Sequence, residues 1–137
     1  LGLNLRLSEI NAVIGKIQMK KLPSFLIQRR KNAKILTELL QNCDVVLPKQ
    51  RKHETLNWYL YTIAHKNRNK VMRKLNSLGI GATVYYSTSI HKTPYYKTKK
   101  KLPNTEWASS HLLCLPIHPK VRALDLEKMQ RVLGNKK

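Results

Sequence analysis

The chain has 137 residues, enough for one domain, and 42% of them are hydrophobic. No apolar run approaches the roughly 18 residues that a membrane span needs, so we expect no transmembrane segment. Its 27 Lys and Arg residues against 7 Asp and Glu give a formal net charge of +20, which attracts polyanions. Because these basic residues are dispersed along the chain, a solvated basic exterior is favoured over a nucleic-acid-reading surface.

The cysteines and histidines show no ligand spacing. Cys43 and Cys114 lie far apart, without a CxxC or Cys/His pattern. Two isolated thiols indicate a reduced, cytoplasmic protein. The five histidines do not converge as metal ligands do, so no metal site is predicted. The sequence starts at Leu1 in mid-pattern, without a start methionine or a signal segment, which we interpret as a piece of something longer.

The first 44 residues are expected to form a helical hairpin. Behind Ser8, a favourable N-cap, apolar residues recur at helical spacing. They are Ile10, Val13, Ile14 and Ile17. Pro23 disfavours helical geometry at the residue before it and can itself open a second helix. The second helix would bury a stripe of Leu26, Ala33, Leu36, Leu39 and Leu40.

After residue 44 short strand-like runs alternate with amphipathic helical segments. Strands are predicted at 45–47, 57–65, 82–86 and 114–115, and helices at 67–78, 105–113 and 125–133. Gly79 is expected to end the helix before it, and 87–103 to form a surface loop. This order predicts an α+β fold, a helical hairpin at 1–44 followed at 45–137 by a small, mostly antiparallel sheet covered by helices.

Four separated pieces form the most specific pattern in the chain. GLNLRLSE at 2–9 resembles G-x-N-x-R-M-x-E and continues through Ala12, Gln18, Leu22 and Arg29 or Arg30. WYLY at 58–61 resembles W-H-L-Y, and GIGATVYYSTSIHKTPYY at 79–96 resembles G-I-x-T-x-V-H-Y-x-P-L-H-x-x-P-Y-Y. LPIHP at 115–119 matches L-P-I-H-P throughout. Over nearly its whole length the chain resembles the DegT/DnrJ/EryC1/StrS family of PLP-dependent sugar aminotransferases.

The resemblance implies the C-terminal small domain of a fold-type I transaminase. In that family pyridoxal 5'-phosphate (PLP) forms a Schiff base with a lysine upstream of the G-x-N-x-R segment. The chain begins at that segment, so we expect no catalytic residue in it, no PLP bound to it alone and no activity of its own. The complete enzyme would be a homodimer that converts the keto sugar of a nucleotide sugar to an amino sugar for polysaccharide biosynthesis, with an amino-acid donor such as glutamate.

Six residues match positions with family roles. Asn4 matches the asparagine that reaches the PLP phosphate of the partner subunit, and Arg6 would support that region; otherwise Asn4 turns the chain and Arg6 is simply exposed. His91 lies where the family approaches the sugar nucleotide. The phenols around it suit base stacking and sugar hydroxyls, or else pack their own loop. The predicted substrate-binding residues are Tyr86, His91, Tyr95 and Tyr96.

The third and second pieces also depart from the family pattern. Tyr59 and Tyr85 stand where the family has histidine, and Ser87 and Ser89 where it has proline. Two other functions therefore stay open. One is a stand-alone basic module that binds nucleic acid, suggested by the charge and by the aromatic residues near basic segments. The other is a regulatory or structural remnant without catalysis.

Overall fold

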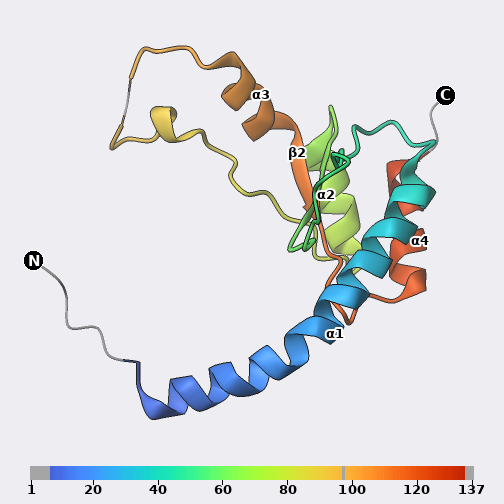
Figure 1. Ribbon diagram of the computed structural model, residues 1–137. Coiled ribbons are helices and arrows are strands. Elements are labelled where there is room, and N and C mark those ends of the chain that lie inside the picture. The colour runs from blue at the N-terminus through green and yellow to red at the C-terminus, as the bar shows by residue number, and fades with distance from the viewer. Residues whose placement is uncertain (1–6, 97, 135–137) are drawn as a thin grey trace, which may run out of the picture.

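A computed structural model describes residues 7–96 and 98–134. The order of its elements is α1 (Glu9–Leu40), β1 (Tyr61–Ala64), α2 (Arg68–Ser77), the short 3-10 helix η1 (Ile90–Lys92), α3 (Pro103–His111), β2 (Leu112–Leu115) and α4 (Ala123–Leu133). Helices beside a small antiparallel sheet confirm the predicted α+β class (Figure 1). None of the helices in the described part is long and apolar enough to cross a membrane.

The predicted helical hairpin is wrong, because α1 is one helix of 32 residues with Pro23 inside it. Figure 1 shows a single uninterrupted ribbon whose first half stands away from the rest of the molecule. Pro23 has no N–H to donate to the carbonyl one turn earlier. Because residues 7–25 are all exposed, water can reach that carbonyl and the helix continues. Ser8 caps the helix as predicted, its hydroxyl accepting from the Asn11 N–H at 3.4 Å.

The sheet is formed by strands far apart in sequence. β1 and β2 are antiparallel, with Tyr61 opposite Leu115 and Ala64 opposite Leu112. Isolated bridges widen the sheet on both sides, from Val46 to Ala64 and from Thr83 to Cys114. The predicted runs at 45–47 and 82–86 are therefore single-bridge contacts rather than full strands. The sheet holds the second piece of the motif pattern beside the fourth.

The core lies between the sheet and three helices. The second half of α1 runs along α4, and α4 also contacts α2. Burial of apolar side chains on these faces is the main term that holds the elements together. Gly79 ends α2 with φ of 77°, a left-handed conformation that glycine adopts without strain. The most buried large side chains include Leu36, Leu40, Tyr61, Ile63, Leu75, Leu113, Leu115, Leu126 and Met129.

Candidate functional site

Arg29 of α1 fixes the backbone of the WYLY piece. Its guanidinium donates to the Trp58 carbonyl at 3.1 Å and to the Tyr59 carbonyl at 2.8 Å, and lies 5.8 Å from the centre of the Tyr59 ring. Trp58 has a φ of 51°, which costs a non-glycine residue roughly 1–3 kcal/mol. The stacking of its ring on Tyr61, with centroids 5.4 Å apart, and the two Arg29 contacts hold this conformation. The first and second pieces of the pattern therefore meet here.

All four pieces of the pattern border one small hollow of about 210 Å³. Arg29 comes from the first piece, Tyr59 from the second, Tyr85 from the third and His118 from the fourth. No Asp or Glu lines the hollow, so the Arg29 charge has no carboxylate beside it there. A guanidinium, two phenols and an imidazole can donate hydrogen bonds to an anionic or hydroxyl-bearing ligand.

Asn32 joins α1 to the LPIHP piece. Its side chain is 3% exposed, and its amide donates to the carbonyls of Ile117 at 3.3 Å and His118 at 3.2 Å. The Gln28 side-chain amide, one turn earlier, donates to Asn32 Oδ1 at 2.9 Å. Because a buried carbonyl without a donor is costly, this amide keeps the turn at 117–118 against the helix. The wall of the hollow is thus held from two sides, by Arg29 and by Asn32.

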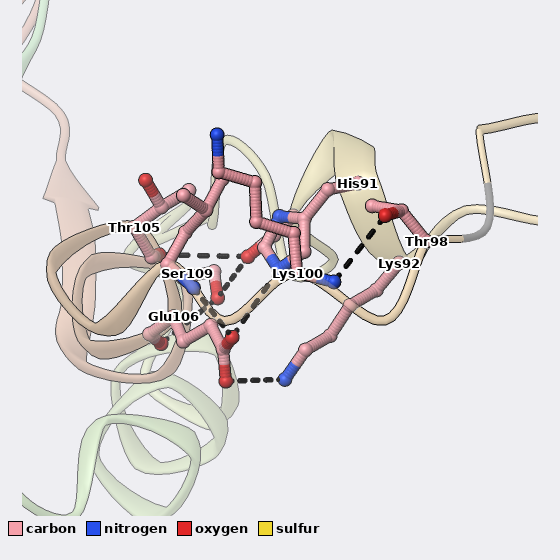
Figure 2. Close-up of polar contacts among 9 residues, drawn as sticks. His91, Lys92, Thr98, Lys100, Thr105, Glu106 and Ser109 are labelled. Atoms are coloured by element: carbon pink, nitrogen blue, oxygen red, sulfur yellow. Dashed lines mark hydrogen bonds and ion pairs between the residues drawn. The ribbon is translucent and has the colours of Figure 1, made fainter.

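A second polar cluster holds the loop that carries the predicted substrate residues. Figure 2 shows His91 and Lys92 of η1 pointing toward Glu106 of α3. The Glu106 carboxylate lies 3.2 Å from His91 Nε2 and 2.5 Å from Lys92 Nζ, and accepts from the Leu102 N–H at 3.2 Å. The hydrogen bond from Lys92, with those from Leu102 and His91, lowers the pKa of Glu106 to about 2. One carboxylate therefore joins both ends of the segment 91–102.

Two serines fasten the same loop beside this cluster. Ser89 is buried, and its hydroxyl is 3.0 Å from that of Ser109 and 3.5 Å from the Thr105 carbonyl. The Thr98 N–H donates to the His91 carbonyl at 3.2 Å, so the loop returns close to η1. Ser89 is one of the departures from the family pattern, and here its hydroxyl has a structural partner.

The predicted substrate residues fall into one buried and three exposed positions. His91 is 8% exposed, with its ring bonded to Glu106, whereas Tyr86 is 79% exposed and Tyr95 88%. Tyr95 and Tyr96 meet edge to face with centroids 4.8 Å apart. Tyr86 borders a separate hollow of about 200 Å³ against α3. The four residues share one loop, but among the described residues no hydrogen bond or ring stacking joins the His91 side chain to these tyrosines. Asn4 and Arg6 lie outside the described residues.

Comparison with known proteins places the chain in a family. The model of the DegT/DnrJ/EryC1/StrS aminotransferase family matches residues 1–135. The chain belongs to this aminotransferase family. The resemblance drawn from the four pieces is confirmed, and both the hollow and the loop cluster are features of a DegT/DnrJ/EryC1/StrS chain.

Among its relatives is the dTDP-4-dehydro-2,3,6-trideoxy-D-glucose 4-aminotransferase of Saccharopolyspora spinosa, 33% identical over 82% of this chain and 30% of its own length. A DegT DnrJ EryC1 StrS aminotransferase from Brucella abortus superposes with a TM-score of 0.86 at 28% identity, over 97% of this chain and 36% of its own. DesV of S. venezuelae, solved with a ketimine intermediate, superposes with a TM-score of 0.87 at 24% identity. The match covers 96% of this chain and 37% of DesV. The chain spans about a third of the length of the curated relatives.

The family is PLP-dependent, and PLP when bound would act as an electron sink for the carbon that bears the transferred amino group. A lysine that tethers PLP needs a desolvated pocket or a cationic neighbour. In residues 7–96 and 98–134 every lysine is exposed except Lys128, which is half-buried on α4. Among the described residues, therefore, no lysine lies in a desolvated pocket formed by this chain alone. No group of three His, Cys, Asp or Glu side chains within the same residues is arranged to hold a metal ion.

Sequence reasoning missed Glu106 and Asn32. Glu106 carried one signal, because it is one of only 7 acidic residues and follows a run of lysines at the start of a predicted helix. Asn32 carried another, because it is a polar residue one turn before Leu36 on the face predicted to be buried. Neither signal predicts the contact that the residue makes, because the partner of Asn32, Ile117, and the partner of Glu106, His91, are distant in sequence.

Proposed function

We propose that this chain is the C-terminal small domain of a nucleotide-sugar aminotransferase. The complete enzyme would transfer an amino group from an amino acid to a keto sugar with PLP. Residues 1–44 would link the domain, 45–137, to the rest of the enzyme, and the lysine that tethers PLP would belong to that rest. The domain by itself would be inactive, and the enzyme would work as a cytoplasmic homodimer.

The observation that carries this proposal is the convergence of the four sequence pieces on one hollow. The same hollow of about 210 Å³ is bordered by residues that lie up to 89 positions apart in the sequence, namely Arg29, Tyr59, Tyr85 and His118. Chance similarity in sequence would not bring the matching pieces together in space. The hollow is lined by hydrogen-bond donors and by no Asp or Glu, which suits a substrate that carries carboxylate, phosphate or sugar hydroxyls.

Within the proposal, two groups of residues contact ligands. Tyr86, Tyr95 and Tyr96 would stack on or hydrogen-bond to the sugar nucleotide. His91 would contribute from the same loop, with its ring oriented by Glu106. Asn4 and Arg6 would reach the PLP phosphate of the partner subunit. Of the described residues, the phenols are exposed enough to meet a ligand without rearrangement.

The first test separates the chain from its enzyme. With PLP added, the purified chain alone should give no internal-aldimine absorbance band and no transamination of a dTDP-4-keto sugar with glutamate. We also join the chain, in one polypeptide, to the part of the Brucella abortus enzyme that it does not match. This fusion should give both the absorbance band and the transamination. A lysine-dependent aldimine band in the chain alone would overturn the proposal that it is inactive by itself.

The second test asks whether the hollow serves the reaction. In the joined enzyme, Arg29→Gln should lower kcat/KM by roughly 100-fold, because a hydrogen bond to a charged group is worth about 1.5–3 kcal/mol. Arg30→Gln is the matched control, because Arg30 lies outside this hollow and makes one hydrogen bond at 3.4 Å to the Leu56 carbonyl. Equal effects of both variants would remove the hollow from the proposed site.

A further inference from the structure

The second half of α1 forms one wall of a groove of about 490 Å³, and the segment 50–58 forms the other. Small-molecule pockets in proteins are typically of this size. None of its described lining residues borders the hollow of Arg29, Tyr59, Tyr85 and His118. We call this space the α1 groove. Six side chains define it, namely Lys34, Glu38 and Gln41 of α1 and Gln50, Leu56 and Trp58 of the facing segment.

Contacts within the chain hold the facing wall in place before any ligand binds. Arg30 Nε donates to the Leu56 carbonyl at 3.4 Å, which ties that segment to α1. The half-buried Trp58 ring stacks on Tyr61, with centroids 5.4 Å apart, and the Tyr61 hydroxyl lies 2.8 Å from that of Thr37 on α1. Because the wall is already fixed by its own contacts, little ordering is needed when a ligand binds. The indole can therefore serve as a rigid apolar surface on one side of the groove.

The α1 wall carries polar groups that no other described residue uses. Lys34, Glu38 and Gln41 recur at one-turn spacing, so they lie on one side of the helix. Their side chains are exposed, and none has a hydrogen-bond or ion-pair partner among the described residues. An ammonium, a carboxylate and an amide therefore remain available to a ligand. The carboxylate and the amide can accept hydrogen bonds from hydroxyls, and the ammonium can donate to an anionic group.

We propose that the α1 groove binds a small anionic saccharide. The C–H face of its sugar ring packs on Trp58 and Leu56, because contact with these side chains removes apolar surface from water. Its hydroxyls exchange hydrogen bonds with the carboxylate and the amides that line the groove. Its one negative group, a carboxylate or a phosphate, pairs with Lys34. This site is separate from the hollow proposed for the reaction and does not depend on the proposed function.

The charges around the groove disfavour two other kinds of ligand. The formal net charge of +20 disfavours a cation anywhere on this chain. The Glu38 carboxylate, one turn from Lys34, disfavours a polyanion such as nucleic acid, which would place several phosphates along the same wall. A ligand with one negative group and several hydroxyls avoids both conflicts.

The test titrates the purified chain with glucuronate and with glucose 1-phosphate, followed by calorimetry and tryptophan fluorescence. At least one of the two should bind saturably with a Kd below about 5 mM, and the tighter one assigns the negative group to a carboxylate or to a phosphate. Trp107→Phe leaves Trp58 as the only tryptophan and should keep the change in fluorescence. Uncharged glucose and inorganic phosphate should each bind about tenfold more weakly, because one lacks the negative group and the other lacks the ring.

Lys34→Gln isolates the contact with the negative group. It should raise the Kd of the charged sugar about tenfold and leave that of glucose within about twofold. Lys31→Gln is the matched control, because Lys31 is an exposed lysine of α1 that does not line the groove. It should change each Kd less than about twofold. Circular dichroism of each variant checks folding, which exposed substitutions should leave intact.

Three outcomes would overturn the proposal. The first is no saturable binding of either charged sugar below about 5 mM. The second is inorganic phosphate that binds as tightly as glucose 1-phosphate, since the groove would then recognise charge alone. The third is a loss of affinity in Lys31→Gln as large as that in Lys34→Gln. Failure of the joined enzyme to transaminate would refute the proposed function but leave a saccharide site in the α1 groove standing.

Discussion

The amide of Asn32 offers a direct measure of how α1 holds the LPIHP turn. Asn32→Leu keeps the size of the side chain but removes the donor to two carbonyls, at 3.3 and 3.2 Å. A buried carbonyl that loses its donor costs about 1–3 kcal/mol. The hydrogen bond to Ile117 is buried, so its loss should cost the full free energy. The hydrogen bond to His118 is partly open to water, so its loss should cost only part of that free energy. The expected loss of unfolding free energy is about 2 kcal/mol.

Urea unfolding, followed by tryptophan fluorescence and circular dichroism, measures this loss. Asn32→Asp is the informative companion, because it keeps the shape and the acceptor but removes the donor, and it should cost at least as much. Asn42→Leu, at an exposed position in the turn after α1, should change stability by less than about 0.5 kcal/mol. If Asn32→Leu costs no more than Asn42→Leu, the amide does not hold the turn and our account of the wall of the hollow is wrong.

Further predictions concern charge and the free half of α1. Because its pKa is lowered from 4.5 to about 2, the Glu106 carboxylate should stabilise the fold fully above pH 4.5 and lose this contribution as pH falls toward 2. A carboxyl NMR titration should show that midpoint, and Glu106→Gln should flatten the acid part of the stability profile more than Glu127→Gln does. Gly15→Ala should raise the helical signal without moving the urea midpoint, because a Cβ there meets nothing within 4 Å and this half of α1 lies outside the core; a raised midpoint would place it inside the cooperative unit. A titration with duplex and single-stranded DNA across salt should show no strong sequence-independent affinity, and a steep salt slope would favour the nucleic-acid module instead.

The sequence alone determined the family and most of the local structure. Periodicity located α2 and α4, and Gly79 marked the end of α2, because spacing and left-handed φ are properties of a few neighbouring residues. The four motif pieces identified the family because their order and separation are together improbable. Pro23 misled the same reasoning, since a local preference against helix gave way where solvent could satisfy the freed carbonyl.

Only the tertiary structure decided which side chains meet. The sequence could not distinguish Arg29 from its neighbour Arg30. The fold places the Arg29 guanidinium 2.8 Å from the Tyr59 carbonyl, 30 residues away. His91 was expected among tyrosines at a binding surface and is instead buried against Glu106. The spacing of Ile10, Val13, Ile14 and Ile17 is that of a buried helix face, yet these side chains are exposed in this chain. Hydrogen bonds and burial between distant segments depend on how elements pack, and local spacing carries no record of that packing.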